Sequence, residues 1–149
     1  MGQMLSKELA MDFLEGDDYH SPENREKMSR GRSLTEEDRL PWLENIRKAT
    51  DPYLIGDSGV IVSCSALSRR SRQVLGVDRP GVQMIYLYGT ESVLAERMLE
   101  RKNHFMPVSL LRSQLDILEE PCLEEALFVS VDASPDHIFG QILSGLRES

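Results

Sequence analysis

Short apolar runs separated by helix-like segments constrain the fold of this chain more than any other feature. The clearest runs are residues 59–63, 82–88 and 126–131, and a shorter one covers 11–14. The three longer runs carry no charged side chain, so we expect both faces of these strands to be buried. Strands of this kind are typical of parallel sheets that have helices on both sides.

Helix start signals lie between these runs. Ser21 precedes Pro22, Thr35 precedes three acidic residues, and Ser134 precedes Pro135, as at helix N-termini. Together with apolar spacing, these signals predict helices over residues 2–10, 21–31, 35–49, 68–75, 91–102, 109–118 and 134–147, with loops at 50–58 and 103–107. The alternation predicts a single three-layer α/β/α domain over residues 1–149, built on a parallel sheet.

The charge and the cysteine content exclude several classes of function. The 149 residues carry a net charge of −8, and the isoelectric point is near 4.9. Bulk electrostatics therefore argue against nucleic acid or an anionic membrane as a partner. No apolar run approaches the roughly 20 residues that span a bilayer, and two cysteines are too few for a disulfide framework. We expect a cytoplasmic protein without nucleic-acid or membrane partners.

Polar and small residues follow the strands, at the sheet edge where α/β proteins bind ligands. After the first strand come Asp17 and His20, and residues 64–67 (CSAL) follow the second. A carboxylate such as Asp17 could hold Mg²⁺ through water or accept a proton from a substrate hydroxyl. The alternative is ordinary turn chemistry, because Asp is common in loops. Cys64 has no base at a suitable spacing, so we do not expect it to be a nucleophile.

Arginines form a second group of candidates. Arg97 and Arg101 lie one turn apart on a predicted helix and could neutralise phosphate oxygens during phosphoryl transfer. The alternative is a solvated helix face on which Glu96 and Glu100 pair with them. The same two interpretations apply to the basic segment 69–72. Trp42 is expected to be a packing residue of its helix.

Taken in order, these segments resemble the gluconate kinase family of P-loop kinases. The matching positions are residues 16–20, Asn24, 27–28, Gly31, Leu34, 38–43, 64–67, Arg72, Arg97, Arg101, 104–107, 110–111, 113–114, 118–119 and Pro121. The resemblance covers essentially the whole chain and implies ATP-dependent phosphorylation of D-gluconate at its 6-hydroxyl, giving 6-phospho-D-gluconate. It implies ATP and Mg²⁺ as cofactors, with a mobile lid around residues 97–121.

The resemblance also implies roles for individual residues. Asp17 corresponds to the carboxylate near the accepting hydroxyl and, through water, the magnesium. The residues implied as gluconate contacts are His20, Arg39 and Arg72, with Arg39 pairing the substrate carboxylate. The residues implied on the ATP phosphates and the lid are Arg97, Arg101 and His104, and Arg101 is expected to be catalytic. The loop after Val131 would border the adenine.

Two departures from the family pattern bear on these expectations. Ser71 stands where the family often places an aromatic residue, and no phosphate loop of the form GxxxxGK[ST] occurs. The lysines are Lys7, Lys27, Lys48 and Lys102, and none follows a glycine. We therefore expect an N-terminally truncated chain without the central first strand of the fold. Its sheet should split between the strands near Val60 and Met84.

Three alternatives remain open at this stage. The chain could be a catalytically inactive truncated isoform that acts through association with a partner. It could be a related P-loop kinase acting on shikimate or a nucleotide, against which residues 38–43 and 104–107 argue. A homodimer is an open alternative for its assembly.

Overall fold

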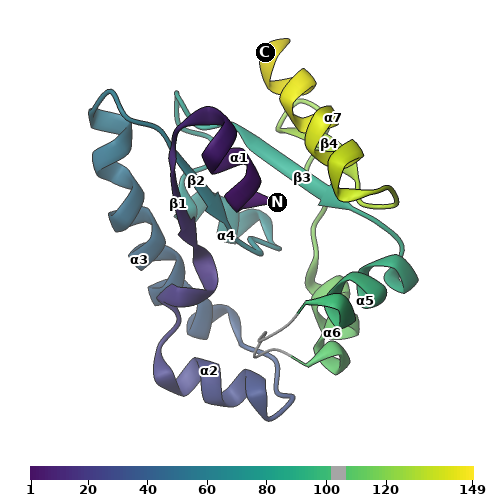
Figure 1. Ribbon diagram of the computed structural model, residues 1–149. Helices are drawn as coiled ribbons and strands as arrows, with labels where there is room; N and C mark the ends of the chain where they lie inside the picture. The colour runs from purple at the N-terminus through teal and green to yellow at the C-terminus, as the bar shows by residue number, and fades with distance from the viewer. Residues whose placement is uncertain (102–106) are drawn as a thin grey trace.

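The strands form two separate parallel pairs rather than one sheet (Figure 1). In the computed structural model, which describes residues 1–101 and 107–149, β1 (Asp12–Glu15) pairs with β2 (Val60–Ser63). β3 (Met84–Tyr88) pairs with β4 (Ala126–Ser130). Within the described ranges no sheet pairing joins β2 to β3, so the expected division of the sheet is confirmed.

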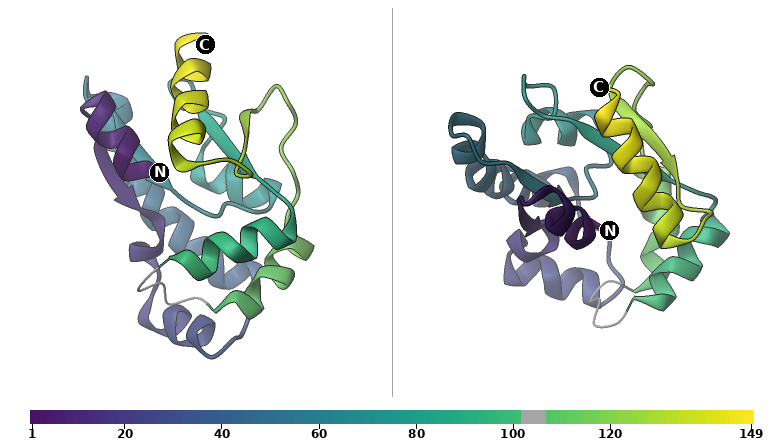
Figure 2. Two further views of the ribbon diagram at one scale, coloured as in Figure 1. Left: turned by 45° about the vertical axis from the view of Figure 1, so that its right-hand side comes forward. Right: turned by 45° about the horizontal axis from the view of Figure 1, so that its top comes forward.

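Helices cover both faces of the strands, which confirms the three-layer prediction. On one side lie α1 (Gly2–Leu9) and α7 (Pro135–Arg147), and both views in Figure 2 show α7 lying across β3 and β4. On the other side lie α3 (Glu36–Ile55) and α4 (Arg69–Leu75), which pack against each other. The strand β2 contacts both layers, because Ile61 packs on the α1–α7 side and Val62 on the α3–α4 side.

One apolar core joins the two strand pairs. Its buried members come from α1, from β4 and the segment after it, and from α7. They are Leu5 of α1, Val129 of β4, Val131 just after β4, and Ile138 and Ile142 of α7. Ile61 of β2 and Ile85 of β3 both pack against this cluster. Side-chain packing under α1 and α7 therefore connects two halves that no described sheet hydrogen bond links.

The helix α3 extends six residues beyond the predicted end at residue 49. The predicted loop at 50–58 was wrong over residues 50–55, although Pro52 lies inside this helix. A proline removes one helical hydrogen bond, but contacts with other elements hold the last turns. Asp51 forms an ion pair with Arg79 at 2.6 Å, and the Tyr53 hydroxyl donates to Asp12 of β1. Sequence spacing could not reveal these long-range contacts.

The remaining elements surround the carboxyl ends of β1 and β2. A 3₁₀ turn, η1 (Gly16–Tyr19), follows β1 and leads into α2 (Pro22–Ser29), whose N-terminus is capped by Ser21. After β3 come α5 (Glu91–Glu100), η2 (Val108–Leu110) and α6 (Leu111–Ile117). Apart from residues 102–106, no helix is both long and apolar enough to cross a membrane.

Truncating Leu43 should test the α3–α4 side of the core. Leu43 is fully buried beside Trp42 and Ile46, so Leu43→Ala should lower the free energy of unfolding by about 2–5 kcal/mol. Leu99 on α5 is 74% exposed, so Leu99→Ala should change the free energy of unfolding by less than about 0.5 kcal/mol. Urea unfolding measures both variants, and equal effects would contradict the assigned core.

Candidate functional site

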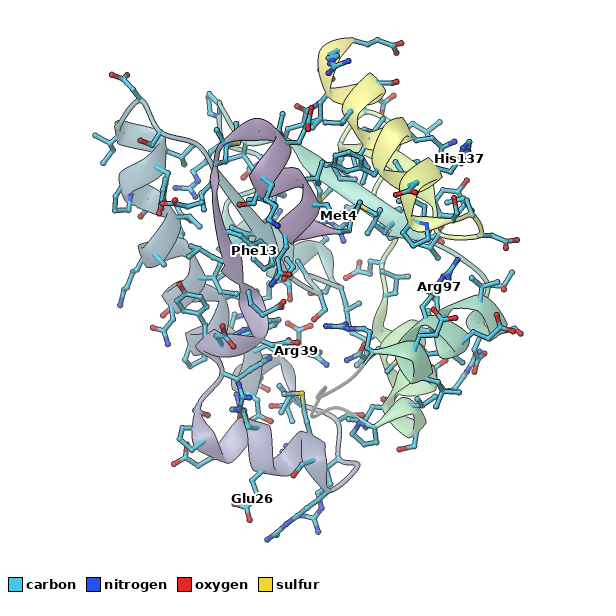
Figure 3. All side chains as sticks on the ribbon, viewed as in Figure 1. Met4, Phe13, Glu26, Arg39, Arg97 and His137 are labelled. Atoms are coloured by element: carbon cyan, nitrogen blue, oxygen red, sulfur yellow. The ribbon has the colours of Figure 1, made fainter. Side chains whose placement is uncertain are left out.

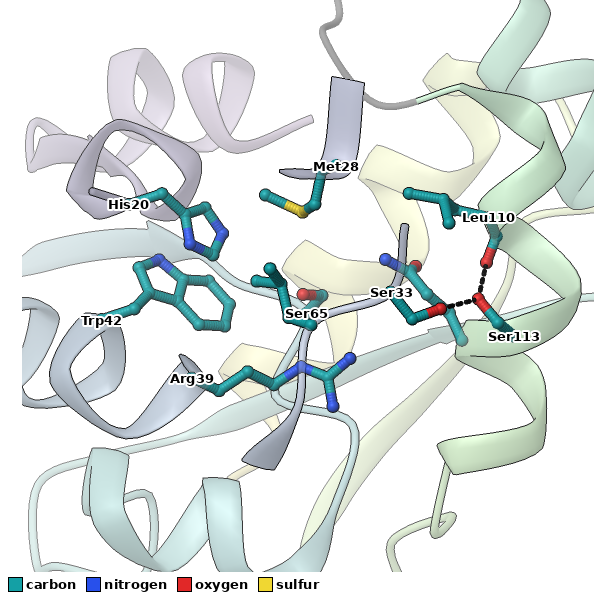
Figure 4. A pocket seen from close by; sticks show the side chains of 10 residues that line it. His20, Met28, Ser33, Arg39, Trp42, Ser65, Leu110 and Ser113 are labelled. Carbon is teal, nitrogen blue, oxygen red and sulfur yellow. Dashed lines mark hydrogen bonds between the residues drawn. The ribbon is translucent and has the colours of Figure 1, made fainter. Parts of the chain in front are cut away.

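A pocket lies at the carboxyl end of the β1–β2 pair, between the α2–α3 segment and α6 (Figure 4). Its lining combines one charged residue with hydroxyl, amide, ring and apolar groups. These are His20, Met28, Ser33, Leu34, Arg39, Trp42, Ser65, Leu110, Ser113 and Gln114. Two residues implied by the resemblance as gluconate contacts, His20 and Arg39, are therefore brought together here.

One wall of the pocket is fixed by Trp42. Its indole nitrogen donates a hydrogen bond of 2.7 Å to the carbonyl oxygen of Gly16 in η1. The His20 ring stacks on the indole, with ring centroids 4.0 Å apart and 17° between the planes. Gly16 itself lies so close to the Ser63 carbonyl of β2 that a Cβ would clash. Trp42 is buried as expected, but it also positions the turn and the histidine.

The His20 imidazole is neutral at physiological pH. Burial, together with the positive charges of Arg25 and Arg39, lowers the pKa of His20 to about 4. Its Nε2 atom lies 4.0 Å from the Asp17 carboxylate, which is too far for a hydrogen bond. A neutral imidazole can both donate and accept hydrogen bonds, so His20 offers the pocket polarity without charge.

Arg39 is the charged residue of the pocket. It lies in the first turns of α3 and is only 7% exposed. No described residue accepts a hydrogen bond from its guanidinium or forms an ion pair with it. The nearby Asp38 carboxylate is engaged by Lys27 at 2.7 Å and by the Thr35 backbone amide. A buried guanidinium without a carboxylate partner suits an anionic ligand.

Lys27 and Asp38 hold this arrangement in place. Their ion pair links α2 to the start of α3, and Asn24 adds a hydrogen bond of 2.9 Å to the Asp38 carbonyl. The hydrogen bond from Lys27 lowers the pKa of Asp38, so this carboxylate stays ionised. The family resemblance included both Lys27 and Asp38. In the structure their ion pair fixes α2 against the start of α3, next to Arg39.

The opposite wall carries groups that sequence reasoning did not single out as site residues. Ser33 donates to Ser113 at 2.8 Å across 80 positions of the chain, and Ser113 donates to the Leu110 carbonyl. Beneath them, Met28, Leu34 and Leu110 form a small buried cluster. The position of Ser65 just after β2 indicated that it lies near the site. No local sequence pattern predicts that α6 contacts the α2–α3 loop.

Asp17 lies beside the pocket rather than in its lining. Its carboxylate is partly exposed, and its carbonyl accepts a hydrogen bond from Arg25. Within the described ranges no cluster of three or more His, Cys, Asp or Glu could hold a metal. One partly exposed carboxylate is nevertheless compatible with Mg²⁺, which keeps several waters and binds substrate phosphates.

The other predicted arginines lie outside this pocket. Arg97 donates to the carbonyls of Val131 and Ala133, at 3.2 and 2.6 Å, and forms an ion pair with Glu100. Arg101 is exposed at the end of α5, and Arg72 is buried against carbonyls on α4's side of the fold. Figure 3 shows Arg39 and Arg97 in separate parts of the fold. His104 falls outside the described residues.

Cys64 is unsuited to nucleophilic catalysis. Burial, with smaller contributions from the carboxylates of Asp17 and Glu15, raises the pKa of its thiol to about 12. A protonated thiol is a poor nucleophile. This is consistent with the expectation that Cys64 is not a nucleophile.

Comparison with known proteins identifies the family. No protein-family model matches the chain. A gluconokinase of Arabidopsis thaliana is 39% identical over 162 aligned residues, covering 100% of this chain and 86% of that protein. The chain belongs to the gluconokinase family. The family expected from the sequence is thereby confirmed.

Solved structures agree with this assignment. A gluconokinase from Sinorhizobium meliloti 1021 superposes with a TM-score of 0.84 and 43% identity, covering 99% of this chain and 83% of that one. An unliganded sugar kinase from Janibacter sp. HTCC2649 gives a TM-score of 0.88 at 37% identity, covering 98% of this chain and 85% of that one. The gluconokinase-family chain thus has the expected α/β kinase fold.

His20 should make stability depend on pH. Its pKa falls from 6.5 to about 4 on folding, so between these values the unfolded chain binds the additional proton. Stability should therefore decline as pH falls through this window, by up to about 1.4 kcal/mol per pH unit from this group. Urea unfolding between pH 7 and 4 should show a weaker decline for His20→Gln. The control is His137→Gln, which removes an exposed histidine of α7. Parallel profiles for wild type and His20→Gln would contradict the assignment.

Proposed function

We propose that this protein is a gluconokinase that transfers the γ-phosphoryl group of ATP to the 6-hydroxyl of D-gluconate. The observation that carries the proposal is the buried, unpaired guanidinium of Arg39 in a pocket lined by hydroxyl and amide groups. A sugar acid needs both features, a cation for its carboxylate and hydrogen-bonding groups for its hydroxyls. Membership of the gluconokinase family supports the same substrate.

The proposed binding mode follows from the positions of the pocket groups. Arg39 binds the substrate carboxylate, and the serines and amide of the opposite wall bind the polyol hydroxyls. These are Ser33, Ser65, Ser113 and Gln114. His20, held on Trp42, adds a neutral donor or acceptor. Asp17, next to His20 at the end of β1, accepts the proton of the attacking hydroxyl and contacts Mg²⁺ through water.

The proposed nucleotide side lies with α5 and the loop after β4. Arg97 holds that loop through the carbonyls of Val131 and Ala133, so it shapes the border of the adenine site. Arg101, exposed at the end of α5, stabilises charge on the transferring phosphoryl group, and His104 belongs to the lid. Mg²⁺ supplies charge neutralisation for the phosphates. The ATP and sugar-acid substrates suit a cytoplasmic enzyme.

The proposed function can be tested through the binding of the ATP phosphates. No lysine of the chain follows a glycine, and Lys27 is engaged by Asp38, so no lysine of the described residues replaces a phosphate-loop lysine. The 149-residue chain should therefore bind gluconate but release little ADP. A version that carries an upstream strand and a GxxxxGKS loop should release ADP with gluconate, ATP and Mg²⁺. ADP release with shikimate or a nucleoside monophosphate, and none with gluconate, would contradict the proposal.

Two arginine variants should separate the proposed roles in the version with the added loop. Arg39→Ala should raise the KM for gluconate about tenfold or more, because a carboxylate-binding group contributes to ground-state binding. Arg101→Ala should lower kcat about a hundredfold with little change in that KM, because its charge acts in the transition state. Arg70→Ala, an exposed arginine of α4, is the control. The same kinetic pattern in both variants would contradict this division.

A further inference from the structure

Arg72 is a buried arginine that the pocket does not use. It lies on α4 and is only 4% exposed, yet it is absent from the pocket lining. Its Nη1 atom donates to two backbone carbonyls, those of Glu119 at 2.7 Å and Leu67 at 3.3 Å. The sequence resemblance implied a substrate contact, which stays a prediction, and the contacts in the structure are with backbone.

The two carbonyls belong to segments that are far apart in the sequence and meet at this point. The Glu119 amide donates to the Leu67 carbonyl at 2.8 Å, although 52 positions separate these residues. The Glu119 carboxylate accepts a hydrogen bond from the Arg69 amide at the start of α4. Arg72 therefore closes a small network that ties the segment after β2 to the segment after α6. We call Leu67, Arg72 and Glu119 the carbonyl clamp.

Each segment carries one wall of the pocket. Leu67 lies two positions after Ser65, which lines the pocket at the end of β2. Glu119 follows α6, the helix that carries Ser113 and Gln114. The clamp thus fixes the end of α6 relative to the end of β2, and these two ends hold groups that face one another across the pocket.

We propose that Arg72 is a positioning residue for the polyol-binding side of the pocket, acting through the carbonyls of Leu67 and Glu119. The effect of Arg72 on substrate binding rests on the proposed gluconate function. The hydrogen bonds of the carbonyl clamp do not depend on that function. Both hydrogen bonds come from Nη1, while Nε and Nη2 are buried without a partner among the described residues. A guanidinium suits this task because it is planar and always charged, and because Nη1 carries two hydrogens, one for each carbonyl. A lysine at the same position would present a single, more strongly hydrated ammonium group.

Hydrogen exchange of the Glu119 amide tests the clamp without any ligand. In Arg72→Met, which keeps an unbranched side chain but removes the donors, this amide should lose protection by about tenfold or more. Arg72→Lys should lose less. The control is Arg70→Met on the exposed face of the same helix, which should keep wild-type protection. If Arg72→Met does not melt cooperatively, Arg72→Lys decides. Wild-type exchange at Glu119 in the variant that decides would overturn the clamp.

Gluconate binding to the 149-residue chain tests the positioning role. Calorimetry should show about tenfold weaker binding for Arg72→Met and for Gln114→Ala, and less than the product of the two losses in the double variant. A residue with only a general structural effect would give independent losses that multiply. Multiplying losses, or wild-type affinity in Arg72→Met, would overturn the positioning role. If the wild-type chain does not bind gluconate, the positioning role and the binding mode proposed above fail together, while the exchange result still decides the clamp.

Discussion

The sheet hydrogen bonds of this protein stop between β2 and β3, and the rest of the structure depends on how the two strand pairs are joined. On one face the junction is apolar, where Ile61 and Ile85 pack into the core under α1 and α7. Near the pocket it is polar, where Leu67 and Glu119 meet beneath Arg72. Apolar side-chain packing, the backbone hydrogen bond between Glu119 and Leu67 and the side chain of Arg72 thus take the place of sheet hydrogen bonds between the two strand pairs.

The proposed substrate pocket is built from both halves. The turn after β1, the start of α3 and the end of β2 supply His20, Arg39 and Ser65, while α6 supplies Ser113 and Gln114. Burying an arginine that no carboxylate contacts directly is costly, and for Arg39 the loss of solvation outweighs the attraction of the Glu36 and Asp38 charges. Asp38 could have been that partner, but Lys27 and Thr35 engage it. The unpaired charge favours binding of a carboxylate over a neutral sugar.

The arginines show how tertiary contacts separate residues that look alike in the sequence. Arg39 faces the pocket, whereas Arg72 and Arg97 donate to backbone carbonyls of segments distant in sequence. Arg101 remains exposed at the end of α5. Arg97 pairs with Glu100, as one of the two interpretations expected, and it also donates to the loop after β4, which neither interpretation included. Its role on phosphate stays a prediction. Arg72 contacts the Glu119 carbonyl and is absent from the pocket lining, and its predicted contact with substrate stays a prediction.

Local sequence patterns determined most of the elements and their order, because apolar periodicity and capping residues act within a few positions. The division of the sheet was predicted from the family pattern, in which the missing strand is the central one. Ser21, Thr35, Ser68 and Ser134 all cap helices in the structure. The sequence also indicated His20 and Arg39, through their place in a family pattern. Only the tertiary structure decided that α3 reaches Ile55, that Ser33 meets Ser113 and that Arg72 grips two carbonyls. Each depends on at least one contact between groups 28 or more positions apart, namely Asp51 with Arg79, Ser33 with Ser113, and Arg72 with Glu119. Local patterns carry no information on contacts over such separations, because these form only when the packed elements bring the groups together.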